Sequence, residues 1–244
     1  MKSFETKPFA VISDPFTLGA TMNGIKKLTY SEQVVEYIKQ AILNGELSPG
    51  DPIKEVELAE KLGISRAPIR EAIQVLAHDG LIDSKPQKAK TIVALTAKQI
   101  KDSYFTGGVL EAAAVTEALP LYTEEDFSTL EKILQKMGHL AEAGDPDSEL
   151  TELDNAFHGI LFSKIDNELL IDLCRRSCQG ISKFLLYRHW VKLFQPKMIY
   201  ARHKMILDAL KAGNPAQLEK IIRQHYIESG EQMARFGVDV AEEV

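Results

Sequence analysis

Apolar residues recur at helical spacing from Thr29 onward. The first predicted helix face consists of Val34, Val35, Ile38, Ala41 and Ile42, and Gly45 ends it. A second, short helix is predicted over 56–62, where Gly63 stops it. A third begins after Ser65, a residue type that caps helix N-termini, and stops at Gly80.

Two short β runs follow the third helix, at 81–84 and 91–95. The tip between them, 85–90, is basic and contains a proline. Helix, helix, turn, helix and β-hairpin in this order are typical of a winged helix-turn-helix. The sequence therefore predicts a DNA-binding domain over 28–95.

Every segment after Leu95 has helical periodicity. Turn signals at 144–146 and 213–215 separate some of these segments. The predicted helices cover 97–118, 123–143, 147–164, 167–187, 190–212 and 215–236. We therefore expect a mostly α protein, with an all-α helical bundle over 96–244. Residues 1–27 show no clear period and are expected to form an N-terminal extension.

Charge is distributed unevenly along the chain. The net charge is −6, which by itself argues against a nucleic-acid binder. However, segment 61–101 holds eight Lys/Arg against three Asp/Glu, whereas 102–244 holds 15 basic and 23 acidic residues. A basic segment attached to an acidic body indicates that only the N-terminal part meets phosphates.

The third helix opens with residues suited to reading DNA. Arg66 and Arg70 are four residues apart and therefore project from one face, while Ser65 offers a hydroxyl and nearby backbone N–H groups to a phosphate. Two arginines on an arbitrary helix are usually a solvated surface. Their place in a three-helix unit with a basic wing, carrying Lys85, Lys88 and Lys90, favours contact with double-stranded operator DNA.

These segments resemble the GntR family of bacterial regulators. The stretch 45–50, Gly-Glu-Leu-Ser-Pro-Gly, is similar to the family's entry motif, and 57–72 is similar to its signature helix-turn-helix. Three positions depart from the family pattern. Val56 stands where arginine is common, Ala67, which we include among the candidate DNA contacts, replaces a common threonine, and Ala89 stands where the wing usually has a glycine.

The C-terminal half contains a candidate set of metal ligands. Asp154 and His158 are four apart on one predicted helix, and His203 and His225 fall on two later helices. Imidazoles with one carboxylate suit zinc, nickel, manganese or iron. From spacing alone, a surface pair or a satisfied core pair remains the alternative.

The same region resembles the FCD ligand-binding domain of the FadR subfamily, in its shorter, VanR-like, six-helix form. The resemblance implies a divalent metal, zinc first, held by Asp154, His158, His203 and His225, and a small carboxylate effector bound near it. Relatives often carry an arginine four residues before a glutamate, and here Glu111 follows Gly107 instead. Arg175 and Arg188 are therefore named as candidate effector contacts. The resemblance also implies a homodimer.

Three functions remain in competition at this point. The first is a transcription regulator whose operator binding responds to an organic acid. The second is a metal-responsive regulator without an organic effector, and the third is a metalloenzyme, which leaves the helix-turn-helix unexplained. No apolar run reaches membrane-spanning length, and the N-terminus lacks a signal-peptide pattern. Location in the cytoplasm is expected, with Cys174 and Cys178 as buried thiols.

Overall fold

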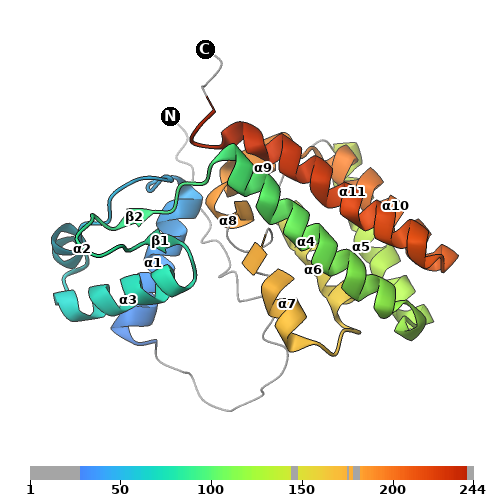
Figure 1. Ribbon diagram of the computed structural model, residues 1–244, viewed down its shortest axis with the longest axis horizontal. Coiled ribbons are helices and arrows are strands. Elements are labelled where there is room, and N and C mark those ends of the chain that lie inside the picture. Colours follow the sequence, from blue (N-terminus) through green and yellow to red (C-terminus); the bar gives the residue numbers. More distant parts are fainter. Residues whose placement is uncertain (1–27, 144–147, 175, 178–181, 241–244) are drawn as a thin grey trace.

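A computed structural model describes residues 28–143, 148–174, 176–177 and 182–240. The extension expected over 1–27 lies outside the described residues, as do Arg175 and Cys178. In the described part, two groups of helices pack around separate hydrophobic cores (Figure 1). The chain is mostly α-helical, as the sequence predicts.

The N-terminal unit is a winged helix-turn-helix. It contains α1 (Tyr30–Asn44), α2 (Glu55–Leu62), α3 (Arg66–His78), β1 (Ile82–Asp83) and β2 (Thr91–Ile92). Thr29 begins α1 with a capping box to Glu32, and Gly45 ends it in the left-handed conformation that glycine adopts most easily. The strands pair antiparallel, Ile82 opposite Ile92. The buried residues of the three helices and of the hairpin form one core over α1, α3 and the wing.

The wing turns tightly at its tip. The Lys88 N–H donates to the Lys85 carbonyl over 3.2 Å. Gln87 has a φ of 60° within this turn, a conformation that glycine adopts without strain and other residues rarely do. The left-handed residue of the wing is therefore Gln87, two residues before Ala89.

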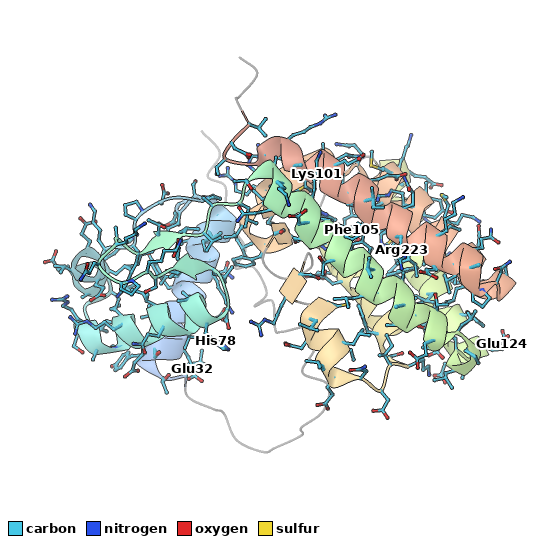
Figure 2. The ribbon with its side chains drawn as sticks, viewed as in Figure 1. Glu32, His78, Lys101, Phe105, Glu124 and Arg223 are labelled. Atoms are coloured by element: carbon cyan, nitrogen blue, oxygen red, sulfur yellow. The ribbon has the colours of Figure 1, made fainter. Side chains whose placement is uncertain are left out.

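The C-terminal unit is an all-α bundle. Its helices are α4 (Ala97–Glu117), α5 (Glu124–Ala143), α6 (Ser148–Phe162), α7 (Glu168–Cys174), α8 (Lys183–Leu185), α9 (Tyr187–Leu193), α10 (Pro196–Ala212) and α11 (Pro215–Met233). Short 3₁₀ turns cover Leu119–Leu121 and Ala234–Phe236. The long helix α4 runs beside α11, and α5 beside α10 (Figure 1). Lys101 and Phe105 are exposed side chains of α4 (Figure 2).

Two glycines permit the close approach of α4 and α11. A Cβ on Gly108 would lie 2.6 Å from the Tyr226 Cβ, and a Cβ on Gly230 would lie 2.7 Å from the Tyr104 Cβ. Both distances are below van der Waals contact, so any side chain at these positions would separate the helices. The glycine at 108 therefore serves the packing that brings α11 to the centre of the bundle.

The predicted helices over 167–187 and 190–212 are wrong in extent. Among the described residues, α7 ends at Cys174, residues 176–177 and 182 are π-helical, and the α-helices α8 and α9 that come next are short. A second break lies at Gln195, whose ψ of 144° is extended, because the residue before a proline is disfavoured in the helical region and Pro196 follows. Apolar periodicity did not reveal either break.

The interrupted segment joins the two units. Leu185 of α8 is buried in the core of the winged domain, whereas Leu186 and Trp190 are buried in the core of the bundle. Among the described helices, none combines the length and the apolar character needed to cross a bilayer.

Candidate metal centre and DNA-reading surface

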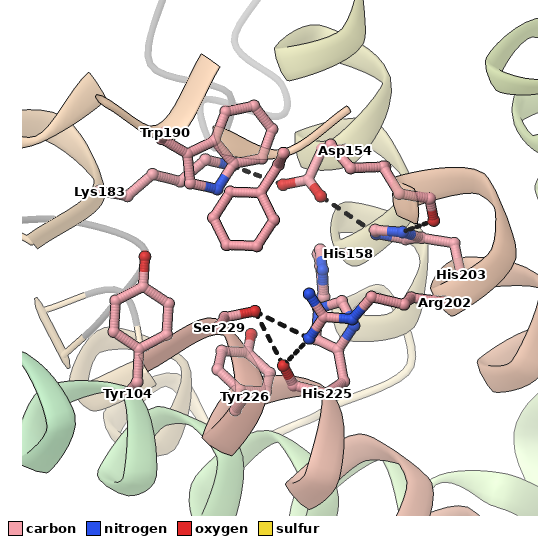
Figure 3. Close-up of a pocket in the computed structure, with 12 residues that line it drawn as sticks. Tyr104, Asp154, His158, Lys183, Trp190, Arg202, His203, His225, Tyr226 and Ser229 are labelled. Atoms are coloured by element: carbon pink, nitrogen blue, oxygen red, sulfur yellow. Dashed lines mark hydrogen bonds and ion pairs between the residues drawn. The ribbon is translucent and has the colours of Figure 1, made fainter. Parts of the chain in front are cut away.

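Three histidines converge inside the bundle from three helices (Figure 3). They are His158 of α6, His203 of α10 and His225 of α11, and one ring nitrogen of each lies within 4.8 Å of the others. Asp154 lies one turn before His158 on α6, beside His203. The arrangement is buried: His203 is 1% exposed and His158 is 4% exposed.

His158 is oriented by a carboxylate from another helix. Glu111 of α4 is completely buried, and its Oε1 lies 2.7 Å from His158 Nδ1. The Tyr226 hydroxyl donates to Oε2 of the same carboxylate. A carboxylate acceptor places a proton on Nδ1, so Nε2 is the atom left to bind a ligand. Burial disfavours the imidazolium, but the charge and hydrogen bond of Glu111 outweigh it and raise the pKa of His158.

His203 also presents its Nε2 to the centre. Its Nδ1 lies 2.8 Å from the Ile199 carbonyl, an atom that only accepts, so the proton is on Nδ1. Nε2 lies 3.1 Å from an oxygen of Asp154 but lacks the alignment of a hydrogen bond, and it is otherwise unpartnered among the described residues. A buried nitrogen lone pair facing a carboxylate is what a shared cation would satisfy.

His225 is held neutral. Burial, followed by the nearby charge of Arg202 and the other two histidines, keeps the pKa of His225 well below its usual value. Its Nδ1 is buried and makes no hydrogen bond to the part of the chain that the structure describes. A neutral imidazole with an orphaned ring nitrogen fits a metal ion, since a metal ligand must be unprotonated.

Asp154 is ionised in this environment. Burial raises the pKa of a carboxyl group, but here the Lys183 ammonium and the contact with His203 outweigh burial and hold the pKa of Asp154 well below its usual range. The Lys183 ammonium pairs with Asp154 Oδ2 and lies 4.6 Å from the centre of the Trp190 ring. Asp154 therefore contacts a cation on one side and faces the histidines on the other.

A small cavity adjoins these side chains (Figure 3). Its volume is about 40 Å³, enough for an ion with a few water molecules. Arg202, a second cation in its wall, donates to the His225 carbonyl and, over 2.9 Å, to Ser229 Oγ. Tyr104, Trp190, Phe194, Ile199 and Tyr226 complete much of the lining.

The cations of the cavity differ from those expected. Lys183 and Arg202 line it, and the sequence analysis did not single out either one. Arg188 is exposed and lies against Gly45, at the end of α1, so its position does not support an effector contact. No pattern in the sequence marks Lys183 and Arg202 as the cations that line the cavity.

The predicted DNA-reading residues form an exposed surface on the winged domain. Ser65 is the N-cap of α3 and makes no cap hydrogen bond through its side chain within the described structure. Arg66, Ala67 and Arg70 are exposed in the first turns of the same helix, and Lys85 and Lys88 are exposed in the wing. Lys90 is half-buried. Thus six of the seven candidates remain accessible to a large partner.

Glu55, which the sequence analysis did not single out, contacts three of these candidates. Its Oε2 accepts from Arg70 Nε at 2.9 Å and from Arg66 Nη2 at 3.2 Å, and its Oε1 pairs with the Lys90 ammonium. The hydrogen bonds from Lys90 and Arg70 lower the pKa of Glu55 to about 2. The two arginines of α3 and the wing lysine are thus held in one ionic cluster.

Sequence comparisons agree with the two-domain architecture. Residues 30–92 match the family described as bacterial regulatory proteins, gntR family, and residues 102–228 match the FCD domain. The chain is 29% identical over 201 residues to the uncharacterized HTH-type transcriptional regulator YdhC of Bacillus subtilis, covering 82% of this chain and 89% of that protein. It is 26% identical over 203 residues to the HTH-type transcriptional repressor RspR of Escherichia coli, covering 83% of this chain and 88% of that protein.

Solved structures share the fold. A GntR transcriptional regulator from Rhodococcus sp. RHA1 superimposes with a TM-score of 0.62 at 24% identity, over 83% of this chain and 96% of that one. McbR/YncC of Escherichia coli superimposes with a TM-score of 0.60 at 22% identity, over 83% of this chain and 96% of that one. The expectation of a regulator is thus confirmed and that of a metalloenzyme is not supported. The chain belongs to the GntR family of bacterial regulatory proteins, and is a DNA-binding transcription regulator with a C-terminal FCD domain.

Proposed function

We propose that a divalent metal and a small carboxylate bind together in the C-terminal bundle and change the affinity of the winged domain for its operator. The convergence of three histidines, two of them buried and one half-buried, and of Asp154 beside a cavity with two cations carries this proposal. It has three parts: DNA recognition, ligand binding and a connection between them.

DNA recognition is assigned to α3 and the wing. Arg66 and Arg70 reach base edges in the major groove while Ser65, at the N-terminus of α3, meets a phosphate. The exposed backbone at Ala67 lets the helix approach closely, and Lys85, Lys88 and Lys90 neutralise phosphates along the adjacent backbone. A homodimer, by analogy with the family, would present two such surfaces to two half-sites.

Metal binding is assigned to Asp154, His158, His203 and His225. Zinc is the first candidate because imidazole nitrogens with one carboxylate form its common ligand set, although nickel, manganese and iron accept the same donors. A bound metal would offer an open coordination position to an oxygen of the effector. Glu111 holds His158 in the required tautomer, and the Ile199 carbonyl does the same for His203.

Carboxylate binding is assigned to Lys183 and Arg202. The two side chains bring positive charge into the cavity wall, where low solvent exposure strengthens their attraction for an anion. They lie on α8 and α10, so the missing arginine on α4 is replaced from other helices. Lys183 is paired with Asp154 beside this cavity, so an organic acid that enters it competes with Asp154 for the Lys183 ammonium.

The connection between ligand and operator runs through 182–190. Lys183 lines the cavity, and Leu185, two residues on, is buried in the winged core. Ser182 is fixed to α4 by a 2.8 Å hydrogen bond between its Oγ and that of Ser103. A ligand that moves Lys183 therefore also moves Leu185, which packs in the same core as α1. The resulting change in operator affinity equals the ligand's differential affinity for the two positions of the winged domain.

Operator titrations test the proposal. An operator selected from random duplexes is titrated with zinc-loaded and chelator-treated protein, each with lactate, succinate or citrate. We expect at least one acid to change the operator dissociation constant several-fold with the zinc-loaded protein only. Lys183→Met should abolish that change, whereas Lys192→Met, on the neighbouring α9, should retain it. Acids that bind without altering operator affinity would contradict the allosteric part.

A metal-responsive regulator without an organic effector is the second candidate, and the small cavity favours it. In that case operator affinity follows zinc occupancy alone and is indifferent to every acid. If neither zinc nor acid matters while Arg66→Ala abolishes operator binding, the sensing assignment is wrong and the DNA assignment stands.

A further inference from the structure

Glu55 connects the helix α3 and the wing, the two parts of the DNA-reading surface, through ion pairs. It is the first residue of α2, whereas its three partners come from α3 and from the wing. Its side chain is 15% exposed, against 51% for Arg66 and 56% for Arg70. The carboxylate thus lies beneath the cations, which cover it.

The backbone places the wing lysine at this point. The Ile53 N–H donates to the Lys90 carbonyl at 2.7 Å, and the Ile92 N–H donates to the Asp51 carbonyl at 2.9 Å. The segment before α2 is therefore paired with the wing at an isolated bridge, Pro52 opposite Thr91, which brings the Lys90 side chain to Glu55. A change in the angle of the wing to α3 would break this ion pair.

The hydrogen bonds leave the DNA-facing ends of the arginines available. Glu55 accepts from Arg70 only at Nε, so the two terminal nitrogens of this guanidinium are not used by the carboxylate. From Arg66 it accepts at one terminal nitrogen. Bidentate recognition of guanine needs a guanidinium held in a fixed plane, and a hydrogen bond behind it restricts that plane.

The ionic balance of the cluster also matters for binding to arbitrary DNA. Three cations share one carboxylate, which reduces the local positive charge that any phosphate experiences. Binding to non-specific DNA depends on this charge, whereas operator recognition depends on the orientation of the donors as well.

We propose that Glu55 is a positioning residue for operator specificity: it fixes Arg66, Arg70 and Lys90 for base and phosphate contacts and weakens their attraction for non-specific DNA. The inference rests on the proposed DNA contacts of α3 and the wing. Its consequence is a change in the ratio of operator to non-specific affinity, which is distinct from a change in either affinity alone.

The test compares Glu55→Gln with Glu57→Gln in the full-length protein. Glu57 lies on the same helix, is exposed and pairs with Lys54 at 2.8 Å, so its substitution removes the same charge and leaves the cluster intact. Dissociation constants are measured by fluorescence anisotropy for the selected operator and for a random duplex, across a salt series. We expect the affinity ratio to fall at least about tenfold for Glu55→Gln, the effect of one lost base contact, and to stay unchanged for Glu57→Gln.

A charge-conserving variant keeps the test decisive if Glu55→Gln unfolds. Glu55→Asp retains the charge but shortens the side chain by one methylene, so it should also lower the ratio, and its folding is checked by circular dichroism. Equal ratios for Glu55→Asp and the wild type, in a folded protein, would overturn the inference.

Variants of Arg66 and Arg70 distinguish a failure of the proposed DNA contacts from a failure of the positioning role of Glu55. If Arg66→Ala and Arg70→Ala leave operator affinity unchanged, the proposed DNA contacts are wrong. If they abolish binding while the Glu55 variants keep the wild-type ratio, only the positioning role of Glu55 is wrong.

Discussion

Glu111 Oε1 lies 2.7 Å from His158 Nδ1, which joins α4 to α6 through two side chains that are almost completely buried. This carboxylate–histidine pair fixes the ring orientation and the tautomer of the imidazole. It also explains why a buried glutamate occurs on a helix whose neighbouring buried positions are small or apolar. The pair is the link between the packing of the bundle and the chemistry of the candidate metal centre.

Glu111→Gln should weaken zinc binding by about 10- to 100-fold, the usual effect of losing the carboxylate behind a metal-bound histidine. Glutamine keeps the size of the side chain and removes its charge. Competition with a coloured zinc chelator measures the affinity, and Glu117→Gln, at an exposed position on the same helix, is the control. Equal zinc affinities for the two variants would show that Glu111 has only a packing role.

Glu55 should make the winged domain sensitive to acid. The pKa of Glu55 is about 2 in the folded protein, against an ordinary value of 4.5, so folding favours the ionised form. The resulting stability is complete above about pH 5 and is lost as the pH falls toward 2. Because its partners are largely exposed, we expect a contribution of about 1–2 kcal/mol.

The measurement is the difference in unfolding free energy between wild type and Glu55→Gln, determined by urea unfolding at several pH values. This difference should shrink as the pH falls from about 5 to about 2. A difference that is independent of pH over this range would contradict the ionic role of Glu55.

Gly108→Ala should destabilise the bundle by about 1–3 kcal/mol, the typical cost of overpacking. The added methyl group would meet the Tyr226 Cβ at 2.6 Å, an atom that moves only with the backbone of α11. Gly159→Ala on α6 is the matched control, since a Cβ there meets nothing within 4 Å, and we expect a gain of about 0.5–1 kcal/mol from helix propensity. Thermal unfolding followed by circular dichroism distinguishes these opposite signs.

Gln87→Gly should stabilise the wing by a few tenths of a kcal/mol or more. Relief of the left-handed strain, about 1–2 kcal/mol, exceeds the entropy cost of glycine in the unfolded chain, about 0.4–1 kcal/mol. Ala89 does not have a positive φ, so Ala89→Gly should only destabilise. Hydrogen exchange of the Val93 amide, which donates to the Leu81 carbonyl across the hairpin at 3.0 Å, compares the two variants. Greater protection in Ala89→Gly would contradict the assignment of the turn.

The sequence predicted the winged domain well because its signals are local. Each helix has an apolar face bounded by a cap or a glycine, as at Thr29, Gly45 and Gly63, and both cap and face lie in one short window. The hairpin was similarly indicated by the basic tip between two β runs. The left-handed conformation of Gln87 was not predicted. Glutamine rarely adopts this conformation, so its presence in the sequence does not indicate one.

The candidate metal ligands could be named from the sequence, but the residues that surround them could not. Asp154 and His158 share a helix face, which spacing reveals. His203 and His225 were named from two later predicted helices, and the resemblance to the FCD domain implied that all four residues hold one metal. The other contacts come from distant segments: Glu111 lies 47 residues before His158, and Lys183 lies 29 residues after Asp154. Such pairs depend on how helices cross, and the break at Gln195 redirects the chain without any interruption of its apolar pattern.

The most direct test of the account is the metal content of the purified protein, measured by elemental analysis and native mass spectrometry. We predict about one divalent metal per chain in the wild type, its loss in His203→Ala, and its retention in His189→Ala, where the histidine instead stacks on Phe236. Acids that copurify with the metal-bound form would be the first effectors to examine. A folded wild-type protein that contains no metal and cannot be loaded with zinc, nickel, manganese or iron would contradict the central claim.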